Sequence, residues 1–193
     1  MILWTLQPKS AWEALEILGV FRCQRDKSFN LTKRDSLEKP YQWMMDRMRE
    51  RIGEPPAGVT YPVWAWHTWE FERRAPDVNS AAFLRRTEEK ALLTLEIPEK
   101  KALLSDFDAW QMVLQNFYVV GDLSPAEYDA LVERLEALPE EELQKETETS
   151  WIRVFDTAPV NRDGFIRGRF VQATFWEIRR ESVQNVEFLP PNG

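Results

Sequence analysis

The sequence predicts a single α+β domain over residues 1–193. Some segments repeat apolar residues with the period of a helix, while others are short, rich in aromatic or β-branched residues and bounded by proline, as strands are. The predicted helices gather between the strands without the regular alternation of a doubly wound sheet. Hydrophobic residues make up 44% of the chain, which is enough for a substantial core.

The predicted strands form one largely antiparallel, split sheet. The first strand ends at a proline, the second is a run of aromatic residues between prolines, and the third closes at Pro98. A longer strand and a short last one follow near the end of the chain. The ranges are Ile2–Gln7, Pro62–Trp69, Ala91–Ile97, Arg169–Ile178 and Ser182–Leu189.

Three helices surround this sheet in the prediction. The first begins at Ser10, a good N-cap residue, and ends at Gly19, because glycine readily takes the left-handed conformation after a helix. The second, Tyr41–Ile52, has apolar residues at i, i+3, i+4, i+7 and i+11. Asp106 opens the third as its N-cap, with Trp110, Val113, Leu114, Phe117 and Tyr118 on its apolar face.

The chain between the third helix and the last long strand is expected to hold one more helix and a polar segment. Ser124 and Glu127 form a capping box, with Pro125 at the first helical position. Pro139–Ser150 is acidic and is predicted to be a solvated helix or a loop. Residues 21–39 are polar and predict another loop. The helix after Pro125 is expected to bury Tyr128, Leu131, Val132, Leu135 and Leu138.

Composition excludes several classes of protein. The formal net charge of −7 argues against broad electrostatic capture of nucleic acid. Cys23 is the one cysteine, so no intrachain disulfide can form, and a reducing, cytoplasmic location is expected. We predict neither a metal site nor membrane insertion, because His67 is the one histidine and no apolar run approaches the length of a membrane span.

Two strands carry residues that suit the wall of a binding cleft. Trp64 and Trp66 share one strand face, where they form either core or a stacking wall for a flat ring. His67 lies in the same aromatic strand, as a packed residue or as a general base. Thr5 and Gln7 share a face of the first strand, toward solvent or toward a ligand amide or ribose.

The long strand near the end of the chain adds further candidates. Alternation places Gln172 and Thr174 on one face and Glu177 on the other. A glutamate at a strand end is usually solvated, but it could also stabilise positive charge in a reaction. The sequence contains no glycine-rich phosphate loop, no nucleophile elbow and no zinc-protease motif that would name a reaction.

Several strings of residues nevertheless resemble a family of short bacterial proteins known only as a domain of unknown function. In order, they are Leu3–Gln7, Tyr41–Met44, Pro62–Trp66, Pro76-Asp77, Leu104–Phe107 with Trp110, and Phe175–Ile178. Their order is also, more distantly, similar to that of the DNA-targeting ADP-ribosyltransferase toxins. The match to the family of unknown function spans nearly the whole chain. The distant likeness to the toxins implies their fold, with NAD as a possible substrate.

The distant resemblance also implies roles for particular residues. Thr5 stands where that family has a histidine, and Thr174 where it has its catalytic glutamate. Glu177 is then the best remaining candidate for a catalytic carboxylate. Thr5, Gln7, Trp64, Trp66, His67, Gln172 and Thr174 would line the NAD or nucleotide site. The implied function is an ADP-ribosyltransferase-like domain, or alternatively a catalytically silent module that binds a nucleotide or a protein.

Overall fold

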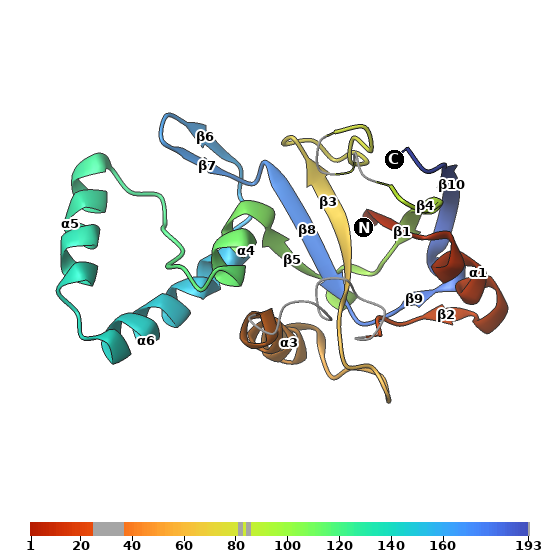
Figure 1. The fold of residues 1–193 in the computed structure, drawn as a ribbon, viewed down its shortest axis with the longest axis horizontal. Coiled ribbons are helices and arrows are strands. Elements are labelled where there is room, and N and C mark those ends of the chain that lie inside the picture. The colour runs from red at the N-terminus through yellow and green to blue at the C-terminus, as the bar shows by residue number, and fades with distance from the viewer. Residues whose placement is uncertain (25–36, 81–82, 84–85, 193) are drawn as a thin grey trace.

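The computed structural model describes residues 1–24, 37–80, 83 and 86–192. Its centre is a six-stranded sheet in the order β10-β4-β1-β3-β8-β5 (Figure 1). Every neighbouring pair in this sheet is antiparallel. The strands are β1 (Ile2–Pro8), β3 (Val63–Trp69), β4 (Lys90–Glu96), β5 (Leu103–Asp106), β8 (Phe170–Phe175) and β10 (Val183–Leu189). The predicted α+β class and largely antiparallel sheet are therefore confirmed.

Helices and short strands surround this sheet. Two small strand pairs, β2 with β9 and β6 with β7, lie outside it. Short 3-10 helices cover Glu99–Lys101, Trp151–Phe155 and Arg180–Ser182. The helices are α1 (Lys9–Leu18), α3 (Glu38–Ile52), α4 (Phe107–Leu114), α5 (Pro125–Glu136) and α6 (Glu140–Ser150); the short strands are β2 (Val20–Phe21), β6 (Val160–Arg162), β7 (Phe165–Arg167) and β9 (Ile178–Arg179).

Two apolar cores form on the two faces of the sheet. The face toward α1 buries Leu3, Leu15 and Leu93. The opposite face packs on α3 and α4 and buries Met44 and Trp110. Because side chains alternate along a strand, β3 contributes to both cores at once.

The helix ends follow the predicted signals except at the start of α1, which begins at Lys9 after Pro8, so that Ser10 lies inside the helix and is not its N-cap. Gly19 follows α1 with a φ of 73°, and its N–H bonds to the carbonyl of Leu15. Asp106 caps α4 by accepting a hydrogen bond from the N–H of Ala109. Both parts of the capping box that begins at Ser124 are present at the start of α5. These signals act within one turn of chain, so the sequence predicts them well.

Five other predictions need correction. The strand expected over Arg169–Ile178 stops at Phe175 and resumes as β9 at Ile178, because the chain turns to bury Trp176, whose indole N–H donates to the carbonyl of Gly53 at 2.9 Å. No strand was predicted between Pro98 and Asp106, but β5 lies there and pairs with β8. Within the expected loop over 21–39, Phe21 belongs to β2 and Glu38 already begins α3, while 25–36 lie outside the described residues.

The other two corrections concern helices. α4 ends at Leu114 because Asn116 takes a positive φ of 58°, so Phe117 leaves the helical face and is 54% exposed. α5 buries none of its residues, although its apolar stripe was expected to be core. Figure 1 shows α5 standing apart from the sheet at one end of the molecule, next to α6. The acidic segment expected to be a helix or a loop is α6.

Candidate functional site

The central sheet is weakly closed between β1 and β3. β1 pairs with β4 through seven residues, from Ile2 to Pro8. Within the described chain, β1 pairs with β3 through one residue pair, in which Trp4 lies opposite Trp66. Side chains take over part of the connection, because the Thr5 hydroxyl donates to the carbonyl of Trp64 at 2.8 Å. This partial separation of two central strands leaves room for a cleft.

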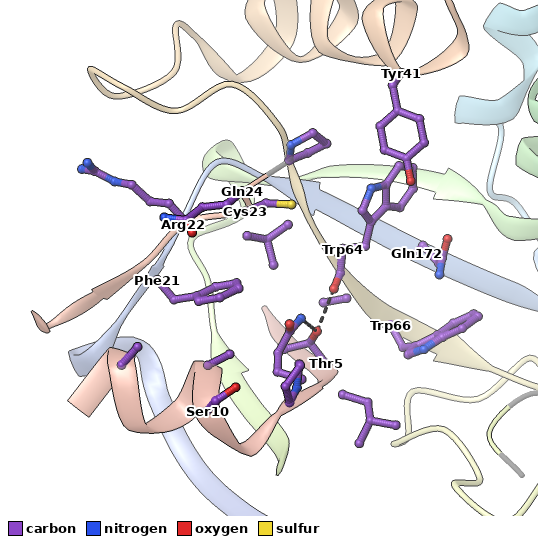
Figure 2. A pocket seen from close by; sticks show the side chains of 18 of the residues that line it. Thr5, Ser10, Phe21, Arg22, Cys23, Gln24, Tyr41, Trp64, Trp66 and Gln172 are labelled. Carbon is purple, nitrogen blue, oxygen red and sulfur yellow. Dashed lines mark hydrogen bonds between the residues drawn. The ribbon is translucent and has the colours of Figure 1, made fainter. Parts of the chain in front are cut away.

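A cleft of about 1170 Å³ lies at this separation. Figure 2 shows Thr5 near its middle, with Phe21 and Arg22 on one side and Trp66 and Gln172 on the other. Its walls come from α1, β1, β2, α3, β3, α4 and β8. Five of the residues predicted to contact a ligand line it: Thr5, Gln7, Trp64, Trp66 and Gln172.

The polar residues on β1 are held in place by each other. Thr5 is 2% exposed, and its hydroxyl accepts a hydrogen bond from the Gln7 amide at 2.8 Å while donating to Trp64. The Gln7 amide group therefore has a fixed position at the cleft wall, with its oxygen making no hydrogen bond among the described residues. A fixed amide can recognise a ligand at a smaller entropic cost than a mobile one.

Trp64 is both core and cleft wall. Its ring stacks on Trp110 with centroids 5.1 Å apart, and the edge of Tyr41 meets it at 6.1 Å. Its indole N–H is buried and has no hydrogen-bond partner among the described residues. A buried donor without an acceptor costs about 1–3 kcal/mol. A ligand or a water molecule that supplied an acceptor would therefore be stabilised here.

Trp66 and Gln172 form the opposite wall, where they are cross-strand partners on β3 and β8. The Trp66 ring contacts Phe107 at 5.1 Å between centroids. The Gln172 side chain is half-buried and makes no hydrogen bond with the described residues. Its other cross-strand partner, Ser105, is fully buried behind the cleft lining, and its hydroxyl has no hydrogen-bond partner among the described residues. This wall therefore combines an aromatic ring with free hydrogen-bonding groups.

Three predicted site residues lie outside the cleft lining. Thr174 is fully buried and its hydroxyl donates to the carbonyl of Leu103 at 3.3 Å. His67 lies at a bulge in β3, with its Nδ1 2.9 Å from the Thr68 hydroxyl. Burial, and secondarily the positive charge of Arg73, lowers the pKa of His67 to about 4. The imidazole is consequently neutral at physiological pH.

Glu177 is held by two arginines at the turn between β8 and β9. Its carboxylate accepts from Arg22 Nε at 3.0 Å and contacts Arg179 Nη2 at 2.7 Å, and its side chain is only 9% exposed. Arg22 lines the cleft, so Glu177 is linked to the cleft through one side chain. β8 ends at Phe175, so Glu177 lies beyond the strand and not on the strand face that alternation predicted for it.

Sequence reasoning missed the wall formed by residues 20–24. Phe21, Arg22, Cys23 and Gln24 line the cleft, but they were assigned to a polar loop. Burial raises the pKa of the Cys23 thiol, so it stays protonated and is a poor nucleophile. β2 consists of Val20 and Phe21 alone, and a strand of two residues is too short to be predicted from periodicity.

Asp106 has a structural role beside the site. One carboxylate oxygen accepts from the N–H of Ala109 at 2.9 Å, and the other accepts from the N–H of Gly168 at 2.7 Å. These bonds join α4 to the start of β8. The residue is 2% exposed and its two oxygens are both engaged, so helix capping accounts for it.

Among the residues that the structure describes, no three His, Cys, Asp or Glu side chains lie together as a metal ion would require. None of the described helices is long and apolar enough to cross a bilayer.

Comparison with known proteins identifies a family but no activity. The family model described as Domain of unknown function (DUF3841) matches residues 2–184. This match confirms the predicted resemblance to a domain family without an assigned function. No curated protein and no solved structure matches the chain.

Proposed function

We propose a function from the cleft itself, because this chain belongs to the DUF3841 family, whose description names no activity. The proposed function is binding of a nucleotide, with NAD as the first candidate. The observation that carries it is the position of the cleft, at the separation of β1 and β3, between two indoles and two amides. The chain would then act as a nucleotide-binding module.

The chemistry of the walls supports a ligand with flat rings. Trp64 and Trp66 present aromatic surface, and stacking of a base on an aromatic side chain contributes about 1–3 kcal/mol. Gln7 and Gln172 each offer donors and an acceptor, as the edge of a base or a carboxamide requires. Uncharged groups of this kind recognise a polar ring without the cost of burying a charge.

The size and charge of the cleft support a ligand larger than one ring. Its volume of about 1170 Å³ exceeds the usual range of roughly 300–1,000 Å³ for small-molecule sites. Arg22 supplies positive charge in the wall, and Glu177 neutralises part of it. A phosphate group would compete with Glu177 for the Arg22 guanidinium, which favours bidentate contacts with oxyanions.

Isothermal titration calorimetry with NAD, AMP and nicotinamide tests this proposal. We expect NAD to bind at sub-millimolar concentration and to quench tryptophan fluorescence. Gln172→Leu removes the free amide beside Trp66 and should weaken binding by about tenfold, the effect of about 1.4 kcal/mol. The control is Gln184→Leu, on β10, whose side chain contacts Glu96 rather than the cleft. Absence of binding by all three ligands at about 1 mM would refute the proposal.

Transfer of ADP-ribose is a second candidate, favoured by the link from Glu177 through Arg22 to the cleft. Cleavage of the nicotinamide–ribose bond leaves positive charge on the ribose, and a placed carboxylate stabilises it by about 3 kcal/mol. Glu177→Gln should then lower nicotinamide release by at least about a hundredfold. The control is Glu181→Gln, which changes an exposed carboxylate nearby. Equal rates of nicotinamide release in Glu177→Gln and wild type would show that Glu177 takes no part in the reaction. If the wild type released no nicotinamide, the proposal of nucleotide binding would stand without a transfer reaction.

A further inference from the structure

The α5 stripe, defined as Tyr128, Leu131, Val132 and Leu135 of α5 with Leu138 just after it, is an apolar face that the described chain covers only in part, because Tyr128 is exposed and the other four are half-buried. None of the α5 residues is buried, and Tyr128 is 49% exposed. Spacings of three and four residues place the stripe on one side of the helix. A helix of twelve residues is only marginally stable alone in water, so an apolar face retained on it indicates a surface that is covered on binding.

Acidic side chains border the α5 stripe along one side. Asp129, Glu133 and Glu136 are exposed, and at 100° per residue they follow the edge of the stripe through the full length of the helix. On the other side, Arg134 is engaged by Glu146 of α6 at 3.2 Å. The free charge beside the stripe is therefore negative.

This negative charge is concentrated in one part of the chain. Residues 122–148, which contain α5 and most of α6, hold ten acidic and two basic residues, a net charge of −8. The whole chain has −7, so the rest of the molecule is close to neutral. Figure 1 shows α5 and α6 projecting from the sheet on the opposite side from α1 and β10.

We propose that the α5 stripe binds an amphipathic helix of a partner protein whose apolar face is bordered by lysine or arginine. The apolar faces would pack together, and the basic border would pair with Asp129, Glu133 and Glu136, as complementary charges flank the seam of a helix pair. A second copy of this chain does not suit the surface, because it would bring two acidic borders together. Nucleic acid and anionic membranes are repelled by the same charge.

The test uses the full chain and a synthetic peptide of about 14 residues made of leucine and lysine in a helical period. Two control peptides have the same composition in strand alternation, or glutamate in place of lysine. Binding is measured by titration calorimetry at about 0.15 M salt. We expect the helical lysine peptide to bind and both control peptides to bind at least about tenfold more weakly.

Variants of the chain locate the binding surface. The triple variant Tyr128→Gln, Leu131→Gln and Leu135→Gln keeps helix propensity but removes most of the stripe. It should weaken binding of the lysine peptide by about tenfold or more. The matched control is Ile17→Gln with Ile166→Gln, on α1 and β7, where the side chains are 82% and 47% exposed and lie outside the cleft lining. This control should bind like the wild type. The capping box and the cleft are unchanged in both variants, so circular dichroism and NAD titration report whether the fold is intact.

Reversing the charge of the acidic residues beside the α5 stripe is the most stringent test of the proposal. Asp129→Lys with Glu133→Lys and Glu136→Lys should reverse the preference, so that the glutamate peptide binds more tightly than the lysine peptide. Glu13→Lys with Glu16→Lys, exposed on α1, is the matched control and should keep the original preference. The proposal is overturned if the stripe variant binds within twofold of the wild type, if the charge exchange leaves the preference unchanged, or if sedimentation shows a dimer of the wild type that the stripe variant abolishes.

Discussion

At the level of single residues, His67 has a property that can be measured without knowing the ligand. Burial and Arg73 both disfavour its charged form and bring its pKa to about 4. Arg73 is fixed at this place because it donates to the carbonyls of His67 and Ile2 and so joins β3 to β1. The imidazole therefore belongs to the junction of the two strands.

We predict that His67 titrates near pH 4 in the folded protein, against about 6.5 in the unfolded chain. Between these values the unfolded chain binds a proton that the folded chain does not. The contribution of His67 to stability is thus fully present above pH 6.5 and is lost as the pH falls toward 4. The ring proton of the one histidine can be followed by NMR. A folded-state pKa of 6 or higher would contradict the assigned burial.

The variant His67→Gln separates the pH dependence that His67 gives to stability from that of the carboxylates. The difference in unfolding free energy between wild type and variant should decrease as the pH falls from 6.5 to 4, because the carboxylates are common to both proteins. A difference that is constant over this range would show that the imidazole has no special protonation state.

Residue chemistry was predictable from sequence where it depends on near neighbours. Ser124, Gly19 and Asp106 cap helices as expected, because each acts through backbone groups one turn away. The position of Glu177 was not predictable, because it depends on where β8 breaks. That break follows from the burial of Trp176 against α3, a contact between segments far apart in sequence.

At the level of elements, periodicity identified the strands and helices but not their partners. The apolar stripe of α5 has the same spacing as that of α3, yet α3 buries five residues and α5 buries none. The pattern shows that an apolar face exists and leaves open what covers it. β5 has four residues, too few for alternation to be recognised beside a helix cap.

The separation of β1 from β3 predicts an asymmetry in hydrogen exchange. Amides of β1 that point toward β4 take part in a seven-residue pairing, whereas those that point toward β3 are supported by one residue pair. We expect the second group to exchange at least about tenfold faster, through local opening that does not unfold the sheet. Residue-resolved exchange by NMR measures this.

The exchange experiment also connects this element to the cleft. A ligand seated between Thr5 and Trp66 should slow exchange of the β1 amides that face β3 and leave those that face β4 unchanged. The amides of β4, which lie between β1 and β10, serve as the internal reference. Uniform protection along both edges of β1 would show that the two strands are closed together, contrary to their register.

At the level of the whole molecule, one sheet supports both cores. Val63 and Ala65 of β3 belong to the core beneath α1, while Trp64 packs against the core beneath α3 and α4. A disturbance of either core must therefore pass through the same strands. Because of this arrangement, the single domain that length and composition predict can be tested by unfolding.

We predict that the two cores unfold in one cooperative transition. Leu15→Ala empties a fully buried position under α1, and Met48→Ala does so under α3, so each should lower the free energy of unfolding by about 2–5 kcal/mol. Because β3 joins the two cores, tryptophan fluorescence and far-UV circular dichroism should give the same urea midpoint within each variant. Ile17→Ala, at an exposed position of α1, is the control and should change stability by less than about 0.5 kcal/mol. If Leu15→Ala shifted one probe and left the other at the wild-type midpoint, the chain would consist of two separately folding units.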